Sequence, residues 1–77
     1  MAGEERDRLR ARMRELLIEA RDRSGLTQVQ LAKTLGRPQS FVSNYETGQR
    51  RVEVADFILI CRALGADAVE VYGRVRT

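Results

Sequence analysis

The chain has 77 residues, of which 43% are hydrophobic and 32% are charged. This length supports one domain with a single core and leaves no room for a second core. The formal net charge is +3, which suits an anionic partner. Histidine is absent and Cys61 is the only cysteine, so a disulfide within the chain is excluded and we expect no zinc site.

No segment has the features of an export or membrane sequence. The first ten residues, MAGEERDRLR, are charged and hold no apolar run. No later stretch approaches the roughly 20 apolar residues that a membrane span requires. The single cysteine fits a reducing compartment. We therefore expect a cytoplasmic protein with no membrane partner and no cofactor.

Residues 4–23 are predicted to form the first helix. Apolar side chains recur there at helical spacing, at Leu9, Met13, Leu16, Leu17 and Ala20. Gly25 follows, and glycine suits the left-handed stop of a helix. Alternating arginines occupy the first half of the helix, at Arg6, Arg8, Arg10, Arg12 and Arg14. We interpret them mainly as solvated surface, with weak phosphate contact as the alternative.

The second predicted helix, residues 28–35, has a start that is marked by local signals. Thr27 and Gln30 have the spacing of a capping box, in which each side chain bonds to the other residue's backbone amide. Leu26 and Leu31 occupy the positions of a hydrophobic staple. These signals agree on one start site.

The third predicted helix, residues 38–47, follows a turn at Gly36 and has two unlike faces. At about 100° per residue, Phe41, Val42 and Tyr45 fall within one arc. Phe41 borders the other face, so contact with a thymine methyl or a sugar is the alternative to core packing. The opposite arc is polar and almost uncharged, with Gln39, Ser40, Ser43, Asn44 and Thr47. Amides and hydroxyls read base edges in the DNA major groove, and a polar helix braced by a shorter one is the geometry of a helix-turn-helix.

The fourth predicted helix, residues 54–64, carries an apolar stripe. The stripe consists of Val54, Phe57, Ile60, Cys61 and Leu64. Because Cys61 lies in its middle, we interpret this cysteine as a small core residue and not as a reactive thiol. Leu59 projects from the opposite side and is a candidate for self-association.

The tail, residues 67–77, holds two competing patterns. Asp67 with Glu70 resembles a capping box and favours a fifth helix over residues 68–75. Valines alternate with polar residues in the same stretch, which is a strand period. We favour the helix. In either form the tail offers a second candidate surface for self-association, through Val69, Tyr72 and Val75.

The stretch SGLTQVQLAKTLGRPQSFVSNYETGQRR, followed by RALG, resembles the phage repressor and Cro family of helix-turn-helix proteins, also called the XRE-like family. The resemblance covers residues from about 16 to 72. It implies an all-α, compact five-helix bundle of the lambda-repressor-like type, as one domain over residues 1–77. It also implies a bacterial or phage protein that binds double-stranded DNA and is associated with the nucleoid.

The resemblance assigns roles to individual positions. The side chains expected to face base edges are those of Gln39, Ser40, Ser43 and Asn44. The side chains expected to contact phosphates are Gln28, Thr47, Gln49, Arg50 and Arg51. Lys33 is added because its charge attracts phosphates. Arg21 and Glu46 stand where relatives form an ion pair between the first and third helices, so Glu46 is interpreted as structural. Pro38 stands where relatives often carry a capping serine or threonine and has no side-chain donor, although proline can begin a helix at its first position.

The predicted function is that of a sequence-specific DNA-binding transcriptional regulator. One reading helix covers too few base pairs to find a site in a genome, so we expect a homodimer on a palindromic operator. Occupying a promoter and blocking polymerase is the simplest action, which favours a repressor. The alternative is an antitoxin or another protein-interaction module with secondary DNA binding and a protein partner. We do not expect an enzyme, because no carboxylate pair is fixed in a cleft and histidine is absent.

Overall fold

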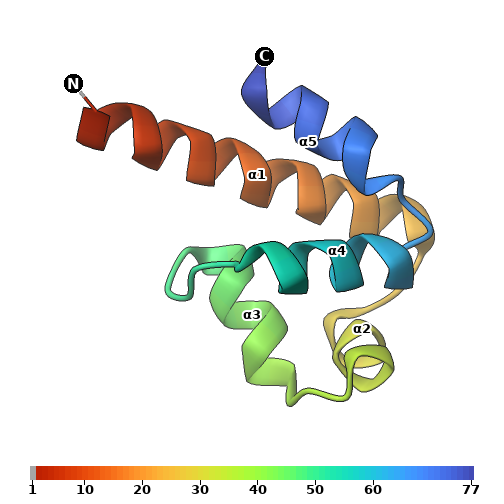
Figure 1. The fold of residues 1–77 in the computed structure, drawn as a ribbon. Coiled ribbons are helices and arrows are strands. Elements are labelled where there is room, and N and C mark those ends of the chain that lie inside the picture. The colour runs from red at the N-terminus through yellow and green to blue at the C-terminus, as the bar shows by residue number, and fades with distance from the viewer. Residues whose placement is uncertain (1) are drawn as a thin grey trace.

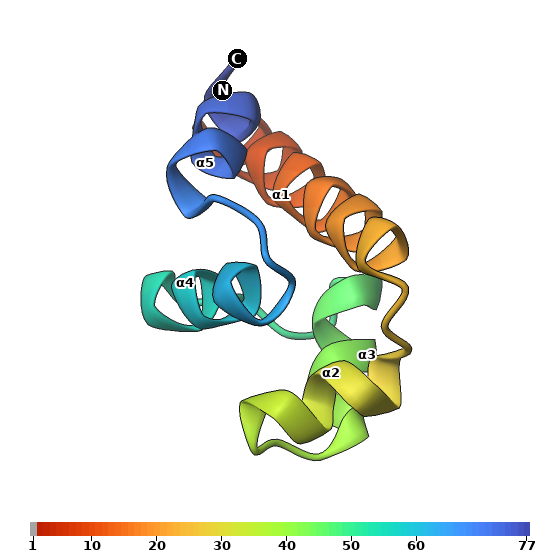
Figure 2. The same cartoon turned by 90° about the vertical axis from the view of Figure 1, so that its right-hand side faces the viewer.

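The computed structural model describes residues 2–77, and within them the chain is all-α, without a strand. The helices are α1 (Ala2–Ser24), α2 (Gln28–Leu35), α3 (Gln39–Thr47), α4 (Val54–Ala63) and α5 (Ala68–Arg76). The long α1 packs against α3, α4 and α5, and α2 packs against α3 and α4 (Figure 1). Figure 2 shows α5 beside α1, with the α2–α3 pair at the opposite end of the molecule. The predicted five-helix bundle is confirmed.

The capping box at the start of α2 forms as the sequence predicts. Thr27 Oγ1 accepts a hydrogen bond from the Gln30 amide at 3.1 Å, and Gln30 Oε1 accepts one from the Thr27 amide at 2.9 Å. Two of the amides that the first turn of a helix leaves without a partner are thereby satisfied. The predicted bounds of this helix, 28–35, are confirmed.

The tail is a helix and not a strand. The Asp67 carboxylate accepts hydrogen bonds from the amides of Val69 at 2.9 Å and Glu70 at 3.4 Å. The Glu70 carboxylate forms an ion pair with Arg74 at 3.3 Å, so in the described chain only the Asp67 half of the predicted box is present. The helical form also buries Val71 in the core, where 9% of the residue stays exposed. This cap and this buried contact favour the helix over the strand.

Glycines in the left-handed conformation end both helices of the helix-turn-helix. Gly36 has φ 68° and ends α2, and Gly48 has φ 85° and ends α3. Glycine adopts this conformation without the strain that a Cβ introduces. Pro38 is the N-cap of α3, in extended conformation, so the helix begins at Gln39, one residue later than predicted. The amide that proline lacks would lie outside the helix in any case.

The core draws residues from every helix. Its fully or almost fully buried side chains include Leu17, Leu31, Val42, Tyr45, Ile60 and Cys61. Fully burying a side chain such as leucine stabilises the fold by about 1.5–3 kcal/mol. The predicted core position of Cys61 is confirmed, and burial raises the pKa of its thiol. Val54 departs from the prediction, because it is 76% exposed at the first turn of α4, beyond the edge of the core.

Two further features concern residues 2–77 as a whole. None of their helices is at once long and apolar enough to cross a bilayer. They also bring no group of three or more potential metal-binding side chains together.

Candidate nucleic-acid interface

One face of α3 carries uncharged polar side chains at the surface. Gln39, Ser40 and Thr47 are exposed, and Ser43 and Asn44 are half-buried. The opposite face of α3 is anchored in the core by three buried residues, Phe41, Val42 and Tyr45. The structure therefore brings the four predicted base-reading residues, Gln39, Ser40, Ser43 and Asn44, onto one accessible face.

The polar groups of this face keep free hydrogen-bonding capacity. Ser43 Oγ donates to the Ser40 carbonyl at 3.4 Å, and Thr47 Oγ1 donates to the Asn44 carbonyl at 3.2 Å. Both hydroxyl oxygens can still accept a hydrogen bond. Within the described chain the side-chain amide of Asn44 has no hydrogen-bond partner, so it can donate and accept at once. That combination is what bidentate pairing with adenine requires.

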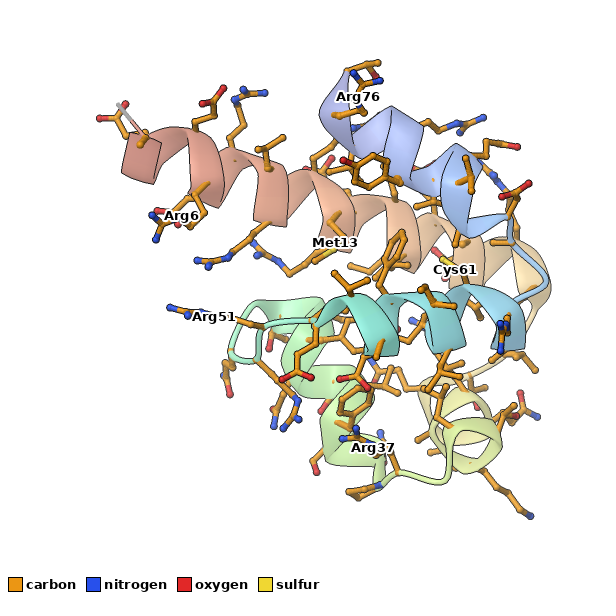
Figure 3. The ribbon with its side chains drawn as sticks, viewed as in Figure 1. Arg6, Met13, Arg37, Arg51, Cys61 and Arg76 are labelled. Carbon is orange, nitrogen blue, oxygen red and sulfur yellow. The ribbon has the colours of Figure 1, made fainter. Side chains whose placement is uncertain are left out.

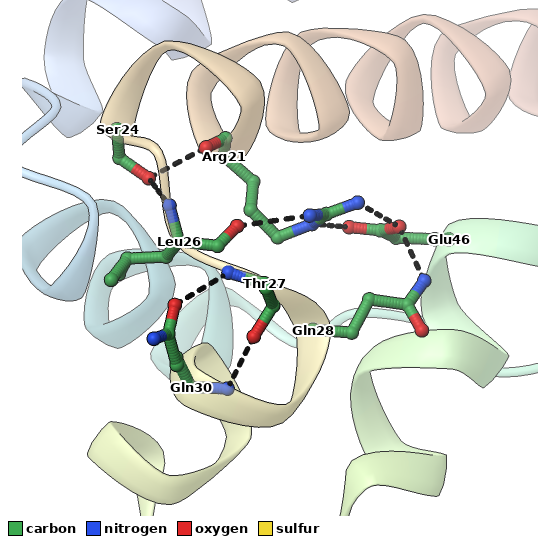
Figure 4. Close-up of polar contacts among 7 residues, drawn as sticks. All are labelled: Arg21, Ser24, Leu26, Thr27, Gln28, Gln30 and Glu46. Atoms are coloured by element: carbon green, nitrogen blue, oxygen red, sulfur yellow. Dashed lines mark hydrogen bonds and ion pairs between the residues drawn. The ribbon is translucent and has the colours of Figure 1, made fainter.

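A polar network behind α3 fixes its position relative to α1 and α2 (Figure 4). Arg21 Nε donates to Glu46 Oε2 at 2.7 Å, and Arg21 Nη2 donates to Glu46 Oε1 at 3.1 Å. The two side chains are 16% and 7% exposed, so water screens the pair little. The hydrogen bond that Arg21 donates to Glu46 raises the pKa of the Arg21 guanidinium, against the opposing effect of burial. Glu46 therefore acts as a structural residue that joins α1 to α3.

Gln28 belongs to the same network. Its Nε2 donates to Glu46 Oε1 at 2.8 Å, which connects the first residue of α2 to the last turn of α3. Gln28 is half-buried and one of its amide hydrogens is used inside the protein. The phosphate contact predicted for Gln28 would use its second amide hydrogen or its backbone amide, which lies at the helix N-terminus where anions are favoured.

The other predicted phosphate-contacting residues are at the surface. Lys33, Thr47, Gln49, Arg50 and Arg51 are all exposed. Lys33 lies on α2, Thr47 ends α3, and the remaining three lie in the loop that connects α3 to α4. Figure 3 shows Arg51 extending outward from this loop. The contacts of these five side chains with phosphates stay predictions.

Phe41 is a core residue covered by two guanidinium groups. Only 5% of Phe41 is exposed, and its ring meets Tyr45 edge-on with centroids 5.7 Å apart. Arg37 Cζ lies 4.3 Å from the ring centroid of Phe41, and Arg50 Cζ lies 4.9 Å from it. Arg37 also forms an ion pair with Asp56 of α4 at 3.1 Å. Core packing is thus confirmed for Phe41 over exposure toward a thymine methyl.

Two arginines near this surface have contacts that the sequence analysis did not predict. Arg37 lies in the turn of the helix-turn-helix, and its contacts with Phe41 and Asp56 are tertiary. The guanidinium of Arg14, on α1, lies against the backbone of Gly48. In the sequence Arg14 is one of several alternating arginines, and no local pattern distinguishes it from its neighbours.

Comparison with known proteins agrees with this geometry. The sequence profile of a family described as "Helix-turn-helix domain" matches residues 6–71. A solved structure described as an XRE-family like protein from Pseudomonas syringae pv. tomato is 42% identical, with a TM-score of 0.84 over 92% of this chain and 85% of that one. The crystal structure of the clp gene regulator ClgR from C. glutamicum is 26% identical, with a TM-score of 0.79 over 88% of each chain. No curated protein sequence matches the chain.

The fold and the exposed polar helix define a helix-turn-helix protein of the DNA-binding regulator class. Within that class, the chain belongs to the XRE-like helix-turn-helix family.

Proposed function

We propose that the protein is a transcriptional repressor that recognises a specific double-stranded DNA sequence. The observation that carries the proposal is the uncharged amide and hydroxyl face of α3, which is exposed on one side and held rigidly on the other. Side chains of this kind pair with base edges in the major groove, which is wide enough to admit a helix. A merely solvated helix face usually carries charged residues.

Base discrimination and general attraction to DNA come from different residues. Gln39, Ser40, Ser43 and Asn44 face the base edges, and each good bidentate pair with a base contributes about 1–3 kcal/mol of discrimination. Phosphate contacts come from Lys33, Thr47, Gln49, Arg50 and Arg51 and from the start of α2 at Gln28. These contacts position α3 in the groove and depend on salt but not on base sequence.

The protein binds DNA as a homodimer in this proposal. Val69, Tyr72 and Val75 of α5 line an apolar hollow of about 480 Å³ that is also bounded by α1 and α4. Val69 is 79% exposed and Tyr72 61% exposed, which is unusual for large apolar residues that have no partner. A second copy related by a two-fold axis would cover these residues on both chains. Leu59 lies outside the hollow and is 49% exposed, so the tail is the favoured surface.

Selection of bound duplexes from a random pool tests the proposal. We expect a palindrome whose half-sites are separated by about one helical turn, because two copies of α3 read two successive major grooves. Placed over a promoter, this operator should lower the expression of a reporter gene when the protein is present. Enrichment of no sequence over the starting pool would overturn the proposal.

A substitution on α3 tests which residues read bases. Asn44→Ala should weaken binding to the selected site by about 1–3 kcal/mol and flatten the base preference at one position of each half-site. Binding to a random duplex should stay unchanged. The control is Thr34→Ala on α2, whose hydroxyl bonds only to the Gln30 carbonyl of its own helix, at 3.1 Å. An identical preference profile for Asn44→Ala and the original protein would refute the assignment.

A further inference from the structure

A basic cleft lies between the first half of α1 and the loop that follows α3. Its volume is about 430 Å³, and its polar lining comes from Arg10 and Arg14 on α1 and from the loop residues Arg50, Arg51 and Glu53. Gly48, the residue that ends α3, also lines it. The cleft therefore connects the loop that is proposed to contact phosphates with α1, whose arginines the sequence analysis interprets mainly as solvated surface.

The Arg14 guanidinium lies in this cleft, close to the backbone of Gly48. A Cβ placed on Gly48 would lie 3.1 Å from Arg14 Cζ and 3.3 Å from Arg14 Nε. Those distances are shorter than most van der Waals contacts, so a Cβ at Gly48 would displace the guanidinium by a few tenths of an ångström. The contact joins residues that are far apart in the sequence, and it places the Arg14 charge beside the C-terminal end of the reading helix.

The charge of Arg14 is not neutralised by a protein carboxylate. Other arginines of α1 form ion pairs one turn away, as Arg12 does with Glu15 at 3.6 Å. Within residues 2–77 Arg14 has no ion-pair partner, although it is half-buried. Arg10 reaches only the exposed Asp7, at 3.8 Å. A half-buried guanidinium without a partner is favourable where an anion completes the site.

The remaining groups of the cleft leave its positive charge in excess. Four guanidinium groups, those of Arg10, Arg14, Arg50 and Arg51, line the cleft with one carboxylate, that of Glu53. Counting also Asp7, which pairs with Arg10, two carboxylates stand against four guanidinium groups, which is an excess of two positive charges. Glu53 forms no ion pair within 4.0 Å in the described chain. Figure 3 shows Arg51 and Arg6 extending at the same end of the molecule, one from the loop and one from α1.

We propose that Arg10, Arg14 and Arg51 hold a phosphodiester of the DNA backbone, outside the base pairs that α3 reads. The assignment rests on the proposed DNA binding and extends it to a second element, α1. Guanidinium groups suit this ligand because their donors match two phosphate oxygens at once. A phosphodiester carries one negative charge, which the excess of positive charge in the cleft accommodates.

The salt dependence of binding tests the site. Arg14→Gln should reduce the slope of log affinity against log salt by about 0.9, the value for one lost phosphate contact. Over a fourfold rise in salt concentration, the affinity of the original protein should then fall about 3.5-fold more than that of the variant. The matched control is Arg12→Gln, which removes the same charge from the same helix but from an exposed side chain that is paired with Glu15. Equal slopes for the two variants would overturn the proposal.

A second pair of variants tests the position of the Arg14 guanidinium beside Gly48 without changing any charge. Gly48→Ala places a Cβ 3.1 Å from Arg14 Cζ, so the guanidinium must shift by a few tenths of an ångström, whereas a Cβ at Gly65 meets no atom within 4 Å. Both glycines have positive φ, so both substitutions should lower the thermal unfolding temperature. Only Gly48→Ala should also lower the salt slope. A salt slope that stays unchanged in folded Gly48→Ala would contradict the claim that the position of Arg14 beside Gly48 supports a phosphate contact.

Modified DNA locates the contact and separates the two proposals. Neutral methylphosphonates placed one at a time in the selected duplex should reveal a position that weakens the original protein but not Arg14→Gln. If no such position exists while the protein still prefers its selected duplex, the cleft assignment fails and the proposed function stands. If the protein prefers no duplex, the proposed function fails. Inorganic phosphate at constant ionic strength should not stabilise the original protein more than Arg14→Gln, and a clear difference would assign the cleft to a free anion instead.

Discussion

Removal of the Glu46 carboxylate should have the largest effect on stability of any single change outside the apolar core. In Glu46→Ala the guanidinium of Arg21 loses two hydrogen bonds, and the amide of Gln28 loses one. Breaking a buried ion pair by removing one partner destabilises proteins by about 3–5 kcal/mol. Arg21 is 16% exposed and keeps its hydrogen bond to the Leu26 carbonyl at 3.0 Å. We therefore expect a loss at the lower end, about 3 kcal/mol.

That loss is large for a chain of this size. Domains below about 80 residues rarely gain more than 3–5 kcal/mol from a single core. Urea unfolding followed by circular dichroism should show the midpoint shift by about 1.5–3 M, given a slope of about 1–2 kcal/mol per molar urea. The control is Glu5→Ala, which removes a carboxylate that is 66% exposed and lies 3.7 Å from Arg8. Its effect should be below about 1 kcal/mol.

A paired substitution separates the penalty of an orphaned charge from the value of the ion pair itself. Arg21→Met with Glu46→Leu replaces both charges by apolar side chains, and such replacements of buried pairs are often neutral or stabilising. The double variant should therefore unfold at a higher urea concentration than Glu46→Ala. The reasoning is refuted if Glu46→Ala unfolds within about 0.5 kcal/mol of Glu5→Ala, a difference near the usual spread of surface substitutions.

Other predictions concern a helix cap, an unpaired hydroxyl and the cysteine. Thr27→Ala should lower the free energy of unfolding by about 1 kcal/mol, because it removes the acceptor for the Gln30 amide; an unchanged urea midpoint would contradict this. The Tyr45 hydroxyl is buried without a hydrogen-bond partner in the described chain, so Tyr45→Phe should leave the free energy of unfolding unchanged or raise it by up to about 1 kcal/mol. Burial raises the pKa of the Cys61 thiol, so the unfolded state loses this proton first and stability should fall as the pH rises above about 8.5. In Cys61→Ala this part of the alkaline loss should be smaller, and Cys61 of the original protein should react with a thiol reagent only at the rate of unfolding.

Local signals were sufficient to predict the bounds of α2 and to place the ends of the other helices within two residues. The spacing of Thr27 and Gln30 determines the start of α2 because both partners of the capping box lie within one turn. Gly36 and Gly48 mark the ends of α2 and α3 for the same reason, since a left-handed residue acts on its own backbone. The tail is harder to predict, because its local signals conflict: the capping position of Asp67 favours a helix, whereas the alternating valines favour a strand.

Features that depend on tertiary packing could not be predicted from local patterns. The spacing of Val54 places it on the apolar stripe of α4, yet its side chain is 76% exposed while Phe57 of the same turn is buried. The bond between Gln28 and Glu46 depends on how closely α2 approaches the end of α3. Arg14 resembles its neighbours in sequence, and only its contact with Gly48 distinguishes it. For the polar face of α3, the sequence predicts which residues are accessible but not which bases they contact.

Glu46 is bound from α1 and α2 at the same time, which limits how α3 can move. A rotation of α3 about its axis would break three hydrogen bonds to this single carboxylate. The helix is therefore oriented before it meets a duplex, and little conformational entropy remains to be lost on docking. A substitution at Arg21 should accordingly slow productive docking and weaken operator binding, even though this side chain has no proposed contact with DNA.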